Sequence, residues 1–204
     1  MDKFTRLTAT ACPLNATNVN TDQLLPARYL KWPRSAGLGK VLFQDLRFDS
    51  EGREQRDFPL NRPQWLDAKI IVAGRNFGCG SSREAAVYAL YDYGIRCVIA
   101  PSFGDIFAGN SVQNGLLTAA VADDVAAELM SRLTAMPQMP ITVDLERQAI
   151  TCGNLSFDFT IDPVRRLRLL NGWDDIALTE SFRDRIAAFK AVDQARRAWA
   201  IPSE

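Results

Sequence analysis

Residues 69–84 read Lys-Ile-Ile-Val-Ala-Gly-Arg-Asn-Phe-Gly-Cys-Gly-Ser-Ser-Arg-Glu, which is typical of a strand, a glycine-rich turn and the start of a helix. Its start, residues 69–74, is a short β-branched apolar run that ends in glycine, which predicts a buried strand. Residues 83–93 place apolar side chains on one face and precede Gly94, which predicts a helix with a glycine C-cap. The glycine-rich turn 76–84 therefore joins a strand to a helix, and we expect it to be the chemical centre of the chain.

The alternation of strand and helix continues downstream. Strands are predicted at residues 95–100 and 115–121, and helices at residues 102–110 and 123–135, the first with a capping-box-like start. Alternation of this kind predicts a parallel sheet covered by helices, which makes the chain an α/β protein.

The flanking segments are less regular. Residues 1–20 indicate a short strand and loop, residues 21–30 a turn leading into a short helix, and residues 31–40 a mobile loop. Short, turn-separated apolar runs within residues 141–160 predict a β-meander, and Asp162 caps a helix that runs to residue 170.

The C-terminal segment carries an amphipathic stripe. A helix is predicted from about residue 179. Its apolar side chains are Phe182, Ile186, Phe189, Val192 and Trp199. We therefore expect a domain over residues 1–170 and a helical tail over residues 171–204 that packs on it.

Composition excludes several classes of protein. Among 204 residues, 24 Lys and Arg balance 24 Asp and Glu, so nothing indicates a nucleic-acid partner. No run of five or more like charges occurs, which argues against an interaction tail. The N-terminus has no apolar signal-peptide core, and no apolar run is long enough to cross a bilayer. We expect a soluble cytoplasmic protein.

The cysteines and the missing histidines restrict the chemistry further. The four cysteines show no Cys-x-x-Cys spacing, so neither a disulfide framework nor a zinc or iron–sulfur site is expected in this chain. The sequence contains no histidine, which excludes a Ser-His-Asp triad, a Cys-His pair and a His-ligated metal from this chain alone.

The central turn has the features of an anion site. Gly78 and Gly80 allow positive φ and close approach of a ligand to the backbone. Amides at the start of the helix favour a carboxylate or phosphate, and Arg83 adds a planar cation suited to bidentate carboxylate binding. The P-loop, the dinucleotide fingerprint and the serine-hydrolase elbow do not fit the turn.

Two readings of Ser81 remain open at this level. Ser81 and Glu84 fit a capping box, in which the serine is an N-cap and nothing more. The same serine oxygen among helix N-terminal amides would also be stabilised as an alkoxide. Cys79 has no second cysteine or histidine beside it, so we rank it as a packing or turn residue.

Several separated motifs resemble one known family. They are residues 18–30 (Asn-Val-Asn-Thr-Asp-Gln-Leu-Leu-Pro-Ala-Arg-Tyr-Leu), 74–84, 103–107 (Phe-Gly-Asp-Ile-Phe), 114–117 (Asn-Gly-Leu-Leu) and 170–179. In order and spacing they resemble the swivelling domain of the aconitase superfamily, and most closely the family of 3-isopropylmalate dehydratase small subunits. The resemblance covers nearly the whole chain and implies a swivelling β/β/α domain with a partly parallel sheet flanked by helices.

The resemblance also implies a function. It implies a stereospecific hydro-lyase that interconverts 2- and 3-isopropylmalate through the dehydrated alkene in leucine biosynthesis. In such a heteromer a large partner subunit carries a [4Fe-4S] cluster, and this chain binds no metal. Ser81 would be the catalytic base, and Arg83, Ser82 and Gly80 would hold a carboxylate of the small dicarboxylate hydroxy-acid substrate.

Further residues fall in matching motifs. Asp22 would orient or bind at the site, although a helix cap or turn residue is an equal reading of it. Arg28 would bind substrate, although an arginine at such a position is more often on the surface or at an interface. Residues 31–40 correspond to the segment that contacts the variable part of the substrate in relatives.

Two departures from the family pattern keep alternatives open. Ala85 replaces a histidine that relatives usually carry, and Asn20 replaces an aspartate. They raise the alternative of a paralogous subunit for another malate-type acid, such as a methylmalate or dimethylmalate. A third hypothesis is a non-catalytic anion-binding module.

Overall fold

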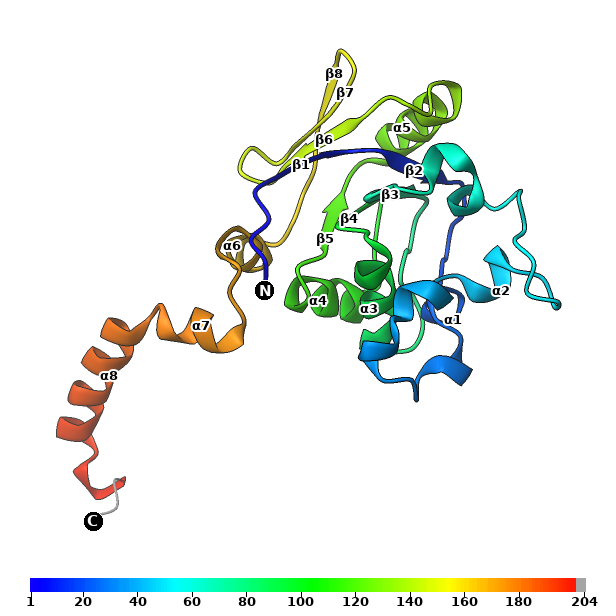
Figure 1. Cartoon of the computed structure of the whole chain (residues 1–204). Helices are drawn as coiled ribbons and strands as arrows, with labels where there is room; N and C mark the ends of the chain where they lie inside the picture. Colours follow the sequence, from blue (N-terminus) through cyan, green and yellow to red (C-terminus); the bar gives the residue numbers. More distant parts are fainter. Residues whose placement is uncertain (201–204) are drawn as a thin grey trace. The chain divides into compact units, whose positions relative to one another are not determined.

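The computed structural model describes residues 1–200 of the chain. Contacts divide the chain into two compact units, one spanning Met1–Gly172 and a second that begins at Trp173. The first unit contains both β-sheets and helices α1–α6, and the second contains α7 and α8 (Figure 1). Docking of the tail on the domain stays a prediction, and residues 201–204 of the predicted tail lie outside the described residues.

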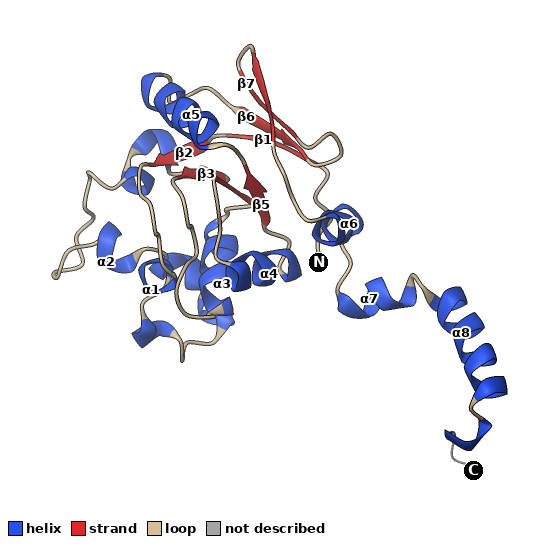
Figure 2. Ribbon diagram, turned by 180° about the vertical axis from the view of Figure 1, so that it is seen from behind, coloured by secondary structure: helices blue, strands red, loops and turns tan. Residues whose placement is uncertain are grey.

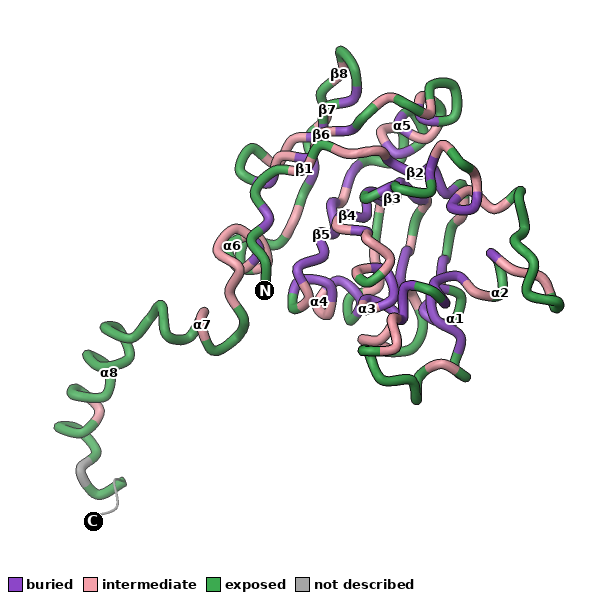
Figure 3. The backbone as a smooth tube through the Cα atoms, viewed as in Figure 1, coloured by how far each residue is buried: buried purple, intermediate pink, exposed green. Residues whose placement is uncertain are grey.

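The central sheet is parallel, as the strand–helix alternation predicts. Its order is β2-β3-β4-β5, and all pairs are parallel. The strands are β2 (Ala11–Leu14), β3 (Ile70–Ala73), β4 (Cys97–Ala100) and β5 (Leu117–Ala120). These strands are short, apolar and almost wholly buried, which is typical of a parallel sheet covered on both faces (Figure 3).

A second sheet is antiparallel and contains the predicted meander. Its order is β1-β6-β7-β8. The strands are β1 (Arg6–Ala9), β6 (Ile141–Asp144), β7 (Ala149–Cys152) and β8 (Leu155–Asp158). Buried and partly exposed residues alternate along β6, as expected for a sheet with one covered face. The N-terminal segment thus supplies a strand to each sheet, where the sequence indicated a single one.

Eight α-helices surround the sheets or form the tail in the described part of the chain. They are α1 (Thr21–Leu24), α2 (Gln44–Arg47), α3 (Glu84–Tyr93), α4 (Asp105–Gln113), α5 (Asp123–Ala135), α6 (Pro163–Asn171), α7 (Asp175–Glu180) and α8 (Arg183–Arg196). Short 3-10 turns lie at Ala27–Tyr29, Arg34–Ala36, Leu38–Val41, Pro59–Asn61, Pro63–Trp65 and Ala198–Ala200.

Strand periodicity divides the core between the two faces of the parallel sheet. Ile71 and Ala73 face one buried cluster, which includes residues of α1 and α3. Ile70 and Val72 face another, which includes residues of α5 and of the antiparallel sheet. Figure 2 shows the same layering, with the antiparallel strands and α3 on opposite sides of the parallel sheet. The sheet is therefore a buried scaffold that holds the turn after β3.

Helix α6 begins and ends at the capping residues that the sequence predicts. Asp162 accepts hydrogen bonds from the amides of Val164 and Arg165, and Gly172 closes α6 with φ +70°. The predicted capping box of α4 is wrong, because the helix begins at Asp105 after Gly104 and has no side-chain cap. Its predicted start lies in the preceding segment, which pairs with the central turn.

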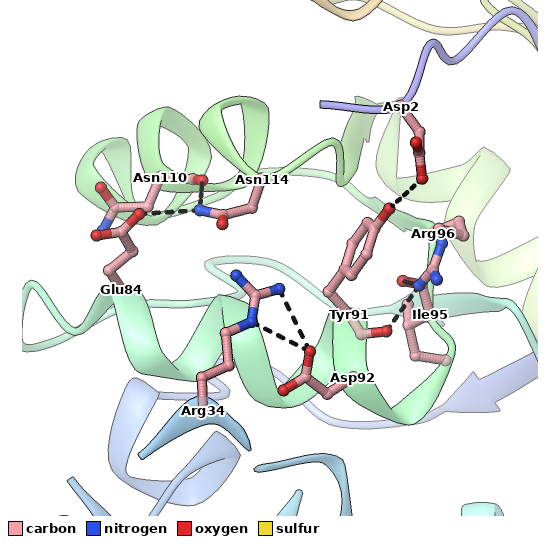
Figure 4. Close-up of polar contacts among 9 residues, drawn as sticks. All are labelled: Asp2, Arg34, Glu84, Tyr91, Asp92, Ile95, Arg96, Asn110 and Asn114. Carbon is pink, nitrogen blue, oxygen red and sulfur yellow. Dashed lines mark hydrogen bonds and ion pairs between the residues drawn. The ribbon is translucent and has the colours of Figure 1, made fainter. Parts of the chain in front are cut away.

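Residues 31–40 are not the irregular mobile loop that we predicted. They form 3-10 turns, and Leu38 is buried in the core. A Cβ on Gly39 would lie 2.4 Å from the backbone nitrogen of Tyr93, so this glycine allows the segment to pack directly on α3. Arg34 donates hydrogen bonds to Asp92 of α3 at 3.3 Å (Figure 4).

The second unit is helical but is interrupted. The single helix predicted from residue 179 is divided, because α7 ends at Glu180 and α8 begins at Arg183. Among the described residues, no helix combines the length and the apolar character that a bilayer-spanning segment needs.

Candidate active site: the turn between β3 and α3

The turn lies between two other chain segments at the end of β3. The amide of Gly78 donates to the Val19 carbonyl at 2.7 Å, and the amide of Phe77 donates to the Ser102 carbonyl at 3.0 Å. Isolated parallel bridges join Asn20 to Cys79 and Phe77 to Phe103. Three of the sequence motifs singled out above, separated along the chain, therefore meet at the carboxyl edge of the parallel sheet, where α/β folds usually bind ligands.

Two asparagines fix the start of the turn. Asn76 and Asn18 both have positive φ, +61° and +54°. The Nδ2 of Asn76 donates to Oδ1 of Asn18 at 2.8 Å, and its amide donates to the Ser102 hydroxyl at 2.9 Å. The sequence analysis did not predict that these two residues contact each other. The available signal was that asparagine tolerates the left-handed region better than most residues.

Gly78 is required where the turn packs on α4. Its φ is +71°, and a Cβ there would lie 2.1 Å from the ring of Phe107. Phe107 in turn packs edge-on against Phe77, with ring centroids 5.5 Å apart. The aromatic pair of Phe77 and Phe107 therefore packs directly against the turn at Gly78.

Gly78→Ala should lower the free energy of unfolding by about 2–4 kcal/mol, because positive φ and a ring clash both oppose the new methyl group. Gly52→Ala is the matched control, since its φ is +77° but nothing lies within 4 Å of its Cβ position. Urea unfolding of both variants measures the difference. Equal losses in the two variants would show that the Phe107 contact adds nothing.

The capping-box interpretation of Ser81, one of the two that the sequence left open, is wrong. Helix α3 begins at Glu84, and its N-cap is Arg83, which makes no side-chain capping bond. The chain first makes a tight bend in which the Arg83 amide donates to the Ser81 carbonyl at 2.8 Å, so Ser81 lies too early to cap. Glu84 accepts a hydrogen bond from Asn114 at the end of α4 instead (Figure 4).

The serine and several amides at this bend are open. Ser81 and Ser82 are exposed, and within residues 1–200 the Ser81 hydroxyl has no hydrogen-bond partner. Across the same described range, no acceptor is found for the amides of Gly80, Ser82, Glu84 and Ala85. A cluster of free donors beside a free hydroxyl suits an anion, as expected for a helix N-terminus.

Arg83 is held by the segment after β2. Its Nη1 donates to Oδ1 of Asp22 in an ion pair, with side chains 19% and 54% exposed. Nε and Nη2 of Arg83 have no partner in the described part of the chain. The structure therefore brings Asp22, Arg83 and the serine bend together, and leaves part of the guanidinium able to bind a carboxylate.

Arg28 is engaged elsewhere. Its guanidinium makes a bidentate pair with Asp45 of α2, which lowers the pKa of that carboxyl group, and lies 4.7 Å from the centre of the Tyr29 ring. Both partners are exposed. A substrate carboxylate would have to compete with Asp45, and substrate binding by Arg28 stays a prediction.

Comparisons with known proteins identify the family. The model of the aconitase C-terminal domain matches residues 1–124, and a second model, described as LeuD_N, matches residues 127–163. The 3-isopropylmalate dehydratase small subunit of Rhodospirillum centenum is 50% identical over 98% of this chain and 100% of its own length. That of Paramagnetospirillum magneticum is 47% identical with the same coverage. This chain belongs to the family of 3-isopropylmalate dehydratase small subunits.

A solved structure supports the fold of the family. The crystal structure of 3-isopropylmalate dehydratase from Methanocaldococcus jannaschii matches with a TM-score of 0.65 and 26% identity. It covers 91% of this chain and 99% of its own. The predicted α/β fold, a partly parallel sheet flanked by helices, is confirmed, and the structure shows it as one parallel and one antiparallel sheet.

The two departures from the family pattern lie in the scaffold. Asn20 caps α1, since its Oδ1 accepts from the Gln23 amide at 2.8 Å and its own amide donates to the Gln23 side chain at 2.9 Å. An aspartate could accept the same bond. Ala85 is half-buried against the core cluster that includes α3.

The described residues do not fit a metal cluster. Within residues 1–200, no three cysteine or acidic side chains are grouped so that they could hold a metal ion. Burial separates Cys12, Cys97 and Cys152 from solvent, and Cys79 alone of the cysteines is half-exposed. An iron–sulfur cluster has no thiolate ligand set here.

Cys79 should be the first thiol to react with a maleimide under native conditions. Burial raises the pKa of Cys12 to about 12 and also raises the pKa values of Cys97 and Cys152, so these thiols stay protonated and inaccessible. Mass spectrometry of limited labelling at neutral pH should locate one adduct, and Cys79→Ser should abolish it. Labelling of a buried cysteine at a similar rate would contradict the packing described.

Proposed function

We propose that this chain is the small subunit of a cytoplasmic heteromeric hydro-lyase that interconverts 2- and 3-isopropylmalate through isopropylmaleate in leucine biosynthesis. Similarity at 50% identity over nearly the whole chain to a curated small subunit of 3-isopropylmalate dehydratase carries this proposal. The chain would be active only with a large subunit. A [4Fe-4S] cluster is proposed on that partner, and no step below is derived through it.

Ser81 is the proposed base. Its hydroxyl is exposed and unbonded in the described chain, so it is free to reach a substrate. As an alkoxide it removes the proton from the carbon beside a substrate carboxylate. The C–H electron pair forms the alkene as the C–O bond of the neighbouring carbon breaks and the hydroxyl leaves as hydroxide. The hydroxide and the proton taken up by Ser81 together make the released water, which restores the alkoxide. The open amides at the helix start and Arg83 supply the field that stabilises the alkoxide and the charge that develops on the carboxylate.

Arg83 is the proposed carboxylate clamp, and Asp22 is assigned an orienting role. Asp22 cannot itself attract an anionic substrate, since like charges repel. Its ion pair with Nη1 instead fixes the guanidinium so that Nε and Nη2 remain for the ligand. The amides of Gly80 and Ser82 complete the anion-binding site.

A second candidate function keeps this chemistry and changes the substrate to another malate-type acid. The observation that favours it is Ala85 in place of the histidine usual in relatives. Its weight is small, because the Ala85 side chain packs against the core and only the amide of this residue is among the open donors of the bend.

Reconstitution tests the proposal. The full chain is co-expressed with the large subunit and assayed for hydration and dehydration of 2-isopropylmalate, 3-isopropylmalate, methylmalate and dimethylmalate. Preference for the isopropylmalates supports the proposal, and preference for another acid selects the second candidate. Failure of the two chains to associate, or activity that Ser81→Ala leaves unchanged, would support a non-catalytic anion-binding module.

A further inference from the structure

Thr21, the first residue of α1, makes two hydrogen bonds to the serine bend. Its amide donates to the Cys79 carbonyl at 2.9 Å, and its Oγ1 donates to the Ser81 carbonyl at 2.9 Å. Thr21 is 2% exposed, so the donor end of each bond is buried, and the bond to the exposed Ser81 is part-buried. Alternate carbonyls of the bend therefore converge on one buried residue.

The planarity of the peptide bond determines in which direction the neighbouring amides of the bend point. In a planar trans peptide unit, the C=O and the following N–H point to opposite sides. When the Cys79 and Ser81 carbonyls point toward Thr21, the amides of Gly80 and Ser82 point away from it. Neither amide has an acceptor within residues 1–200. Gly80 adopts φ +91°, a left-handed conformation that glycine supplies without strain.

The segment that carries Thr21 is itself rigid. Asn20 and Gln23 form a reciprocal capping box around the start of α1, and Leu24 anchors the helix in the core. Helix α1 packs beside α3 (Figures 1 and 2). Thr21 therefore belongs to a rigid, buried segment, and its hydrogen bonds hold the more exposed bend in place.

We propose that Thr21 is a positioning residue, which sets the amides of Gly80 and Ser82 as a pair of donors for a substrate carboxylate. This inference rests on the proposed function and deepens it, since it names the donors and the residue that aims them. Thr21 does not touch substrate; it acts through the carbonyls of Cys79 and Ser81.

Thr21→Val and Thr21→Ser form the test pair. Valine has nearly the same shape but loses the Oγ1 donor, whereas serine keeps the donor. With the large subunit, Thr21→Val should raise KM for isopropylmalate by about 10-fold with a smaller change in kcat, because carboxylate binding is weakened in ground and transition states alike. Thr21→Ser should stay within about 2-fold of wild type.

Amide hydrogen exchange of the isolated full chain gives a readout that does not depend on activity. The Arg83 amide, which donates to the Ser81 carbonyl, should exchange about 10-fold faster in Thr21→Val and at the wild-type rate in Thr21→Ser. The Ile71 amide in buried β3 reports global opening and should not change. Thr118→Val is the matched control, a 5%-exposed threonine on β5 that should alter neither readout.

The outcomes separate the two proposals. Unchanged exchange at Arg83 in Thr21→Val would overturn the positioning role, whatever the activity. Faster exchange with unchanged KM would also overturn it, because the bend would then be ordered for no catalytic purpose. An inactive wild-type pair would overturn the proposed function, while the exchange result would still decide whether Thr21 orders the bend.

Discussion

Ser81→Ala should lower kcat of the reconstituted enzyme by about 10³-fold, a typical contribution of a positioned base, while leaving the stability of the chain unchanged. The second half of this expectation follows from the structure. Ser81 does not cap α3, and its hydroxyl makes no hydrogen bond within residues 1–200. Removing a true N-cap would cost about 0.5–2 kcal/mol. Kinetics and urea unfolding on the same preparations therefore separate the catalytic reading from the structural one.

Ser82→Ala is the neighbouring control for Ser81. It removes an equally exposed hydroxyl but keeps the Ser82 amide, which is the proposed carboxylate donor. We expect a loss of less than about 10-fold, the value of a single neutral hydrogen bond. Equal losses in the two serine variants would deny Ser81 a special role. A destabilised Ser81→Ala chain with near-normal kcat would restore the capping interpretation.

The scaffold was predictable because its signals are local and repeated. β3, α3 and α5 lie within a residue or two of their predicted limits, because apolar periodicity and terminal glycines are read from adjacent residues. The packing of residues 31–40 on α3 was not predictable. Polar residues with glycine are typical of a loop, and only the close approach of Gly39 to α3 explains why this one is packed.

The candidate site was predictable in composition but not in arrangement. The glycine-rich turn, Ser81 and Arg83 were found from residue type and family resemblance. Local sequence patterns offered a capping box of Ser81 and Glu84. Glu84 instead accepts a hydrogen bond from Asn114, the C-cap of α4, 30 positions away. Thr21 was missed for the same reason, because its contacts with Cys79 and Ser81 join segments that no local pattern connects.

Arg83→Lys should lower kcat/KM of the reconstituted enzyme by roughly 100-fold, about the value of a lost charge-assisted hydrogen bond. Lysine keeps the charge and has three N–H donors, but these are arranged tetrahedrally. It therefore cannot pair with Asp22 and at the same time present two coplanar N–H groups to a carboxylate. Arg83 is largely enclosed, with its side chain 19% exposed, so water replaces the lost contacts poorly.

Arg75→Lys is the matched control for this change. Arg75 directly precedes the same turn and also pairs with an aspartate, Asp123, but its side chain is 68% exposed. An exposed ion pair contributes little, so kcat/KM should stay within about 2-fold.

Asp22→Asn separates the ion pair of Arg83 from its binding of the carboxylate. The variant keeps an acceptor for Nη1 but removes the charge, so the loss of kcat/KM should be smaller than in Arg83→Lys. Near-normal kinetics in Arg83→Lys would exclude direct carboxylate binding by Arg83, and the open amides of the bend would then have to hold the substrate alone.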